Sequence, residues 1–187
     1  MKHRALLLLP LLLTLVCHPS LAEEKQPEVL KWDALVPEGF NPDKLFEKYE
    51  LDKMKDSDPR ADEFMREMKQ VWKAAPVVES MEGKYVKLPG FVVPLETEGG
   101  KVSEFFLVPY FGACIHVPPP PANQMVYVVM EKGQNIEVTG EMFEAVWVTG
   151  TLSIKRTSNE LGDAGYVLNA TATEPYTEEE GSITIGP

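Results

Sequence analysis

One cysteine and one histidine stand two residues apart near the middle of this chain, as Cys114 and His116. In an extended segment, residues i and i+2 point to the same side, so the thiolate and the imidazole can converge. Both groups are good ligands for Zn²⁺ and Cu⁺. Two ligands do not complete a tetrahedral zinc site, so acidic side chains, water, Asn123, Gln124 or a partner protein would fill the remaining positions. We therefore predict an open zinc or copper(I) site at Cys114 and His116.

Two other interpretations of this pair stay open. A Cys–His dyad for nucleophilic catalysis needs the imidazole within hydrogen-bond reach of the sulfur, an orienting group and an oxyanion hole. Residues i and i+2 of a strand lie about 6–7 Å apart at Cα, which is awkward for a tight dyad. The sequence also has no glycine-rich nucleophile elbow. The third interpretation is structural, a small buried cysteine beside a capping histidine.

Four consecutive prolines follow the pair, and they are Pro118, Pro119, Pro120 and Pro121. Proline fixes φ and donates no backbone hydrogen bond, so the run favours polyproline II and cannot be a central strand. We expect a rigid exposed loop that rests against Tyr110 and Phe111, and that either shapes a pocket beside Cys114 or docks a partner. The alternative is a loop that only fixes a crossover, with Asn123 and Gln124 satisfying its backbone groups.

The first 22 residues have the features of an export signal. A basic stretch from Lys2 to Arg4 precedes about a dozen apolar residues, and Ser20-Leu21-Ala22 supplies a small-x-small cleavage site. The apolar stretch is shorter than the ~20 residues that span a bilayer. We therefore expect cleavage after Ala22 and no membrane insertion of the mature protein. In the alternative, Cys17 is acylated, but Val16 stands where a small residue normally precedes a lipidated cysteine.

The mature chain is strongly acidic. Removal of residues 1–22 takes away two of the 18 basic residues and none of the 29 acidic ones, so the net charge changes from −11 to −13. This charge opposes binding to nucleic-acid phosphates and to anionic lipid, and we expect no nucleic-acid partner. The remaining 165 residues are enough for one domain with a core. They contain one thiol, so no internal disulfide can form in an oxidising compartment.

Residues 23–76 are predicted to form a helical N-terminal extension. Asn41-Pro42-Asp43 is typical of a helix start and predicts a short helix that ends at Tyr49. Asp58 as N-cap and Pro59 in the first helical position predict a second helix that ends near Ala75. Apolar residues of this second helix share one face, and we interpret its methionines as packing. The face comprises Phe64, Met65, Met68, Val71 and Trp72.

From residue 77 the apolar pattern changes to the period of strands. Residues 77–176 contain five stretches rich in Val, Phe, Tyr and Trp, which predict strands at 85–95, 102–110, 125–131, 145–155 and 166–174. Five antiparallel strands of this size fit a small closed or partly open barrel of the oligonucleotide/oligosaccharide-binding (OB) type. Gly150 is expected at a bend of the fourth strand. The predicted fold class is α+β, mostly β, with this OB-like barrel, and residues 177–187 are expected to be a loose acidic tail.

The motifs around the pair also carry a resemblance to a known family. Gly90 to Glu96, and Phe106 to Gln124 with Phe-Gly-Ala-Cys-Ile-His-Val-Pro-Pro-Pro-Pro-Ala-Asn-Gln at its centre, resemble the exported bacterial family called domain of unknown function 3299. The similarity extends nearly across the mature chain through Trp32 and Leu35, Val146-Trp147-Val148-Thr149-Gly150, and Ala164-Gly165-Tyr166. The resemblance brings no established activity. It implies a Gram-negative periplasmic protein and a setting near transporter components used under zinc scarcity.

These patterns together predict a periplasmic, non-enzymatic binding or accessory protein that handles zinc or copper at its Cys-x-His loop. The alternative from a different class is a metal-free protein-interaction module of an envelope transport assembly, which would act through the proline run. A thiol enzyme centred on Cys114 is the third alternative.

Overall fold

The computed structural model describes residues 26–55, 58–95, 97, 99–113, 119–137 and 145–177. Its helices are α1 (Asp43–Tyr49) and α2 (Arg60–Lys73), and single 3₁₀ turns lie at Trp32–Leu35, Leu51–Lys53, Glu79–Met81 and Ala122–Gln124. Its strands are β1 (Glu28–Val29), β2 (Tyr85–Pro94), β3 (Lys101–Val102), β4 (Glu104–Val108), β5 (Val126–Met130), β6 (Ile136–Glu137), β7 (Ala145–Ser158) and β8 (Asp163–Pro175). No helix in these ranges is long and apolar enough to cross a membrane.

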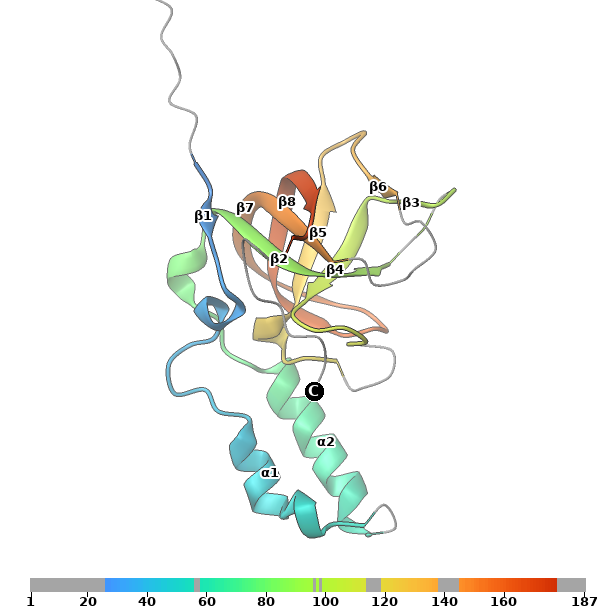
Figure 1. Ribbon diagram of the computed structural model, residues 1–187. Coiled ribbons are helices and arrows are strands. Elements are labelled where there is room, and N and C mark those ends of the chain that lie inside the picture. The colour runs from blue at the N-terminus through green and yellow to red at the C-terminus, as the bar shows by residue number, and fades with distance from the viewer. Residues whose placement is uncertain are drawn as a thin grey trace, which may run out of the picture.

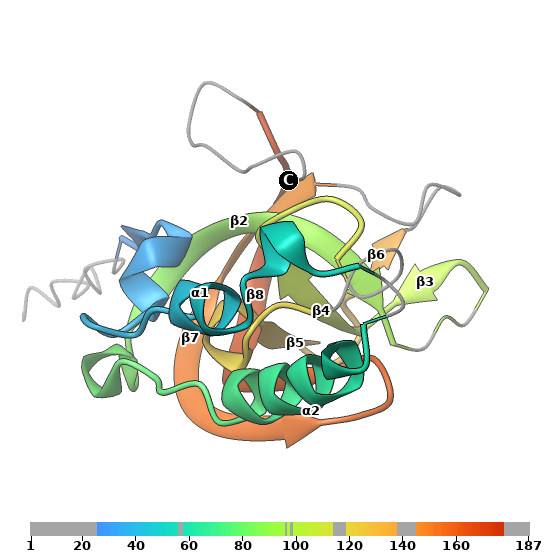
Figure 2. The same ribbon diagram turned by 90° about the horizontal axis from the view of Figure 1, so that it is seen from below.

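Five strands form a sheet that closes on itself. They pair in the order β2-β4-β5-β8-β7, and β7 pairs in turn with β2. Figure 2 shows β2 and β7 curving around this closed sheet. Four of the five pairings are antiparallel, but β5 and β8 are parallel. The expectation of a purely antiparallel sheet is therefore wrong at one pairing, because strand directions cannot alternate all the way around a ring with an odd number of members.

The five predicted strands are all present, with ends that differ by a few residues. The stretch predicted at 102–110 is divided at Ser103, where β3 leaves the closed sheet and pairs with β6. The register between β7 and β8 shifts between Thr149 and Gly150, so the glycine lies at an irregularity as predicted. The mostly-β, α+β class is confirmed.

Apolar side chains cover both faces of the sheet between β2 and β5. Successive residues of a strand alternate between faces, so Phe105 and Leu107 join the inner core, whereas Phe106 and Val108 join a second, outer cluster. The segment that connects β4 to β5 contributes Ala113 and Met125 to this outer cluster. The outer face is thus covered by the chain itself rather than left to solvent.

The segment before α1 is anchored by a buried tyrosine hydroxyl at one end of the sheet. Tyr166 on β8 donates to the carbonyl oxygen of Leu35 at 2.8 Å and accepts from the backbone N–H of Val78 at 2.7 Å. Trp32 Nε1 donates to the carbonyl oxygen of Pro89 at 2.7 Å. Trp32 and Leu35 are 7% and 0% exposed. Both side chains therefore anchor this segment to the sheet.

The two helices form a hairpin that projects from one end of the sheet (Figure 1). Asp58 Oδ1 accepts from the backbone N–H of Arg60 at 2.9 Å, which places the start of α2 within a residue of the prediction. Phe64 and Met68 are buried against α1, as expected. Met65 is 36% exposed, so its predicted place on the packed face is wrong. The reason is that α1, with seven residues, covers only a narrow stripe of the 14-residue α2.

The Tyr166 hydroxyl is expected to be a major source of stability. Tyr166→Phe leaves Leu35 without a donor and Val78 without an acceptor, so the free energy of unfolding should fall by about 1–3 kcal/mol. Urea unfolding measures this change as a lower midpoint at constant slope. The control is Tyr85→Phe, because the hydroxyl of the half-buried Tyr85 forms, among the described residues, a single hydrogen bond, with the Thr171 hydroxyl at 3.2 Å. Equal midpoints for Tyr166→Phe and the parent would contradict this role.

Candidate functional site

The predicted metal ligands, Cys114 and His116, lie outside the described residues, as does Pro118. The described part of the chain contains no group of three or more His, Cys, Asp and Glu side chains that could hold a metal ion. The other predicted site residues are described, and they are Tyr110, Phe111, Pro119, Pro120, Pro121, Asn123 and Gln124. Their positions indicate what the proline run does.

The described prolines are packed into the molecule. Pro120 and Pro121 are buried and Pro119 is half-buried, so the expectation of an exposed loop is wrong for these three residues. Two glycines at the start of β8 allow this close packing. A Cβ at Gly162 would lie 2.8 Å from Met125 Cε and 3.3 Å from Pro119 Cβ, and a Cβ at Gly165 would lie 2.8 Å from the carbonyl oxygen of Ala122.

Asn123 ties the proline run to the connection between α2 and β2. Its side chain is fully buried, and Nδ2 donates to the carbonyl oxygen of Pro76 at 2.9 Å. Its Oδ1 has no hydrogen-bond partner among the described residues. Gln124 is half-buried, and its backbone N–H donates to the carbonyl oxygen of Pro121 at 2.7 Å. The Asn123 bond is of the kind expected for a loop that fixes a crossover.

The two aromatic residues before the Cys-x-His pair differ in exposure. Tyr110 packs against the outer apolar cluster and is half-buried. Phe111 is 48% exposed, and its ring meets that of Phe91 edge to face, with centroids 5.9 Å apart. Phe111 is therefore the predicted loop residue that offers apolar surface to solvent.

Two hollows lie between α2, the proline run and the β7–β8 hairpin, and we call them together the α2 groove. They share Lys73 and Asp163, whose Nζ and Oδ1 atoms are 3.2 Å apart. The first hollow, of ≈ 280 Å³, is also lined by Met68, Lys69, Trp72, Pro119 and Pro120. The second, of ≈ 350 Å³, is also lined by Ala74, Arg156, Thr157, Ser158 and Ala164.

The walls of the α2 groove are held in place from β7. The Arg156 guanidinium donates to the carbonyl oxygens of Lys73 and Ala75 at 2.8 and 2.7 Å, so the end of α2 is fastened to the sheet. These carbonyls are among those that have no partner within a helix. The groove combines an apolar hollow, cationic groups and hydroxyls, which suits the binding of a ligand with both apolar and polar parts.

Sequence reasoning missed this groove. It placed Met68 and Trp72 on one apolar helix face and interpreted the methionines as packing. Met68 is indeed 3% exposed, whereas Trp72 is half-buried and lines the first hollow. Lys73 stood in no motif with Arg156 and Asp163, because it lies more than 80 residues before them in the chain. The one local sign was an aromatic residue on a helix face rich in methionine.

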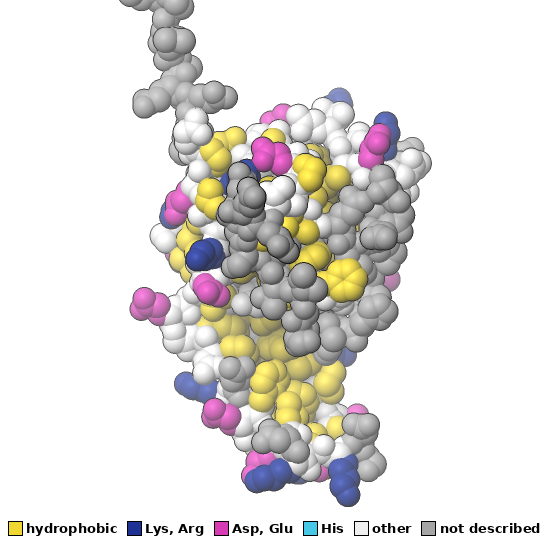
Figure 3. Space-filling view, viewed as in Figure 1, with side chains coloured by type: hydrophobic (Ala, Val, Ile, Leu, Met, Phe, Trp, Pro, Cys, Tyr) yellow, Lys and Arg dark blue, Asp and Glu magenta, His cyan; other side chains and the backbone are white. Residues whose placement is uncertain are grey.

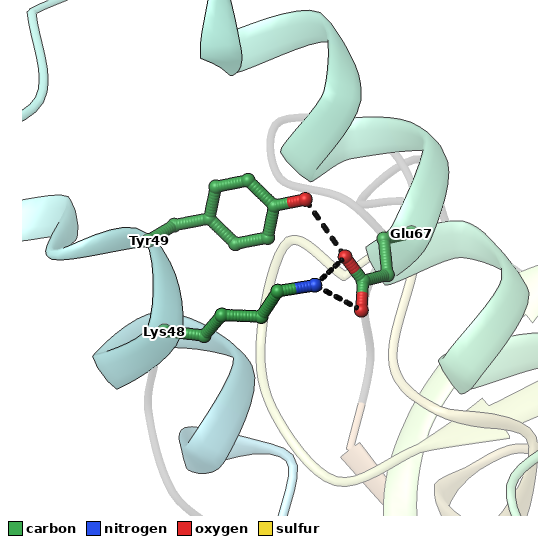
Figure 4. Close-up of polar contacts among 3 residues, drawn as sticks. All are labelled: Lys48, Tyr49 and Glu67. Atoms are coloured by element: carbon green, nitrogen blue, oxygen red, sulfur yellow. Dashed lines mark hydrogen bonds and ion pairs between the residues drawn. The ribbon is translucent and has the colours of Figure 1, made fainter.

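A polar cluster joins α2, which lines the groove, to α1. Figure 4 shows Lys48 and Tyr49 of α1 pointing toward Glu67 of α2. Lys48 Nζ lies 2.8 and 2.6 Å from the two carboxylate oxygens of Glu67, and the Tyr49 hydroxyl donates to Oε2 at 2.7 Å. The bonds from Lys48 and then Tyr49 hold the pKa of Glu67 below its ordinary value of 4.5. The bond to Glu67 raises the pKa of both Lys48 and Tyr49.

These shifts predict an acid-sensitive contact between α1 and α2. Because the pKa of Glu67 is lower in the folded protein, its contribution to stability is present above about pH 4.5 and is lost as the pH falls through the folded value. Glu67→Gln should therefore lose less stability than the parent between neutral and acidic pH, as measured by urea midpoints. Glu63→Gln, an exposed change on the same helix, is the charge-matched control. An equal loss for Glu67→Gln and the parent would contradict this assignment.

The chain is similar to a protein family and to a solved structure. A family model described as a protein of unknown function (DUF3299) matches residues 32–175. The crystal structure of a DUF3299 family protein from Pseudomonas aeruginosa PAO1 is similar, at 39% sequence identity and a TM-score of 0.63. That similarity covers 84% of this chain and 100% of the other. No match was found among curated proteins.

Proposed function

This chain belongs to the DUF3299 family, and we propose that it is a non-enzymatic binding protein of the bacterial cell envelope that docks a partner through the α2 groove. The family description names no activity, so the proposal rests on the residues of the chain itself. The sequence features of the first 22 residues support export to the periplasm.

The closed sheet serves as the scaffold in this proposal, and we assign it an OB-like barrel. The ring of five strands with β2 joined to β7 supports the assignment, because the OB fold is a five-stranded, partly open barrel. Proteins of this class often bind oligonucleotides. The net charge of −11 supports a different use here, because phosphate backbones are bound by basic surfaces.

The observation that carries the proposal is the half-buried Trp72 in the first hollow of the groove. Tryptophan contributes much of the binding energy at many interfaces, because its large ring supplies a wide apolar contact. The hollow adjoins a hairpin on which apolar side chains gather in Figure 3. Inside this hairpin a cluster of apolar side chains packs together, and Leu45, Tyr49, Phe64 and Met68 in it are 3–8% exposed. Trp72 lies at the edge of that cluster, where it is half-buried and lines the hollow.

Photocrosslinking in cells tests this docking function. With a photoreactive amino acid in place of Lys69, at the groove, we expect one adduct of defined mass. The same amino acid at Lys132, an exposed turn residue between β5 and β6, should give none of it. Adding Trp72→Ala should reduce the adduct by roughly tenfold or more, as for truncation of an interface hot spot. The same adduct from Lys132, or its survival in Trp72→Ala, would rule out docking at the groove.

A second candidate function is metal handling at Cys114 and His116. It is favoured by the spacing of this pair, which supplies one soft and one imidazole ligand within three residues. The remaining ligands would come from water or from a partner. Such an open site would exchange its metal readily and would bind it more weakly as the pH falls through the imidazole pKa near ~6.5.

Titration of the mature protein with Zn²⁺ and with Cu⁺ tests the metal function. Cys114→Ser and His116→Ala should each reduce affinity by roughly tenfold or more, since even changes around a metal ligand often cost that much. Met68→Leu, in the described packing of α2, is the control and should change nothing. If both loop variants bind metal as the parent does, the metal function is wrong.

A further inference from the structure

We propose that the occupant of the α2 groove is an extended, acidic segment of a partner protein with an apolar side chain between its carboxylates. This inference rests on the docking function proposed above and adds the chemistry of the partner. It is carried by the charges, the apolar lining and the hydrogen-bonding groups of the two hollows.

The groove is cationic on an acidic protein. In the part of the chain that the structure describes, its lining carries Lys69, Lys73 and Arg156 against one carboxylate, Asp163. The whole chain has the opposite balance, with 18 basic residues against 29 acidic ones. An acidic ligand is therefore repelled by the net negative charge of the chain and attracted by the cations of the groove. This charge distribution would steer an acidic partner to the groove and favour it over partners without negative charge.

Two of these cations are available to a ligand carboxylate. Lys69 and Arg156 form no ion pair within the described part of the chain. Arg156 is also held in one position by its two bonds to backbone carbonyls, so little side-chain freedom is lost when a ligand binds. Lys73 pairs with Asp163 through side chains that are 64% and 30% exposed, and such exposed pairs exchange partners at low cost.

The first hollow suits an apolar side chain flanked by polar backbone. Met68, Trp72, Pro119 and Pro120 supply its apolar walls. The proline run has no backbone N–H to offer, so the donors must come from side chains. Trp72 Nε1 is buried, so the donors that the hollow offers to the carbonyl oxygens of an extended chain are the ammonium groups of Lys69 and Lys73.

The arrangement of the two hollows favours an elongated ligand over a single anion. They share the Lys73–Asp163 pair and so adjoin one another, and each has at least one further cation, Lys69 in the first and Arg156 in the second. A ligand that engages both must therefore present carboxylates on both sides of an apolar group.

Fluorescence anisotropy with three labelled peptides tests the inference. The first has two central leucines flanked by pairs of glutamates, the second has glutamines in place of the glutamates, and the third has glycines in place of the leucines. We expect the first alone to bind, with an affinity that falls as salt rises. Lys69→Glu combined with Lys73→Glu should weaken it at least tenfold, whereas Lys101→Glu combined with Lys132→Glu, on exposed residues outside the groove, should not.

Intrinsic fluorescence gives a second readout of where the peptide binds. Of the three tryptophans, Trp32 and Trp147 are 7% and 2% exposed, whereas Trp72 lines the first hollow. Binding at the groove should change the emission of the parent, and Trp72→Phe should remove that change. A change that survives in Trp72→Phe would overturn the assignment of the site.

The outcomes separate this inference from the docking function. Equal binding of the glutamate and glutamine peptides, with loss in Trp72→Ala, would overturn the acidic partner and leave groove docking intact. Binding of neither peptide, or binding unchanged by any groove variant, would overturn both. Binding of the glutamate peptide only after removal of residues 178–187 would identify the chain's own acidic tail as the occupant and overturn the assignment to a partner.

Discussion

The hydroxyl of Tyr166 is the contact on which the rest of the structure depends. It lies at the start of β8 and bonds to two backbone groups that are distant in sequence, at Leu35 and Val78. Those groups belong to the segment before α1 and to the connection after α2. One buried side chain thus holds both ends of the helical hairpin against the sheet. Because unpaired buried polar groups are costly, the hairpin cannot leave this position without breaking both bonds.

The closed sheet imposes a second constraint, which is topological. A ring of five strands must contain a parallel pair, and here it is β5 with β8. The long β7–β8 hairpin therefore has to lie between β5 and β2, and its turn comes beside the segment that leads into β5. Gly162 and Gly165 lie at that contact, where side chains would meet Met125 and Ala122. The segment that contains the prolines thus packs directly against the glycines at the β7–β8 turn and the start of β8.

The proposed binding surface lies beside this contact between the proline run and the β7–β8 hairpin. The proline run forms one wall of the α2 groove, α2 forms the second, and the hairpin of β7 and β8 forms the third. Arg156 fixes the end of α2 to β7, and the Lys48–Tyr49–Glu67 cluster fixes α2 to α1. A groove whose walls are fastened in this way is largely formed before a ligand arrives, which lowers the entropy lost on binding.

The sequence alone determined the approximate positions of the two helices and of the five main strands, and it singled out Gly150 in the fourth predicted strand, because these follow from local propensity and from the spacing of apolar residues. It also singled out the Cys-x-His pair, since spacing within three residues needs no fold to be seen. Only the tertiary structure decided that Pro120 and Pro121 are buried, that Met65 is exposed and that Lys69, Arg156 and Asp163 line one groove. These facts depend on contacts between segments far apart in the chain, on which the local pattern of residues carries no information.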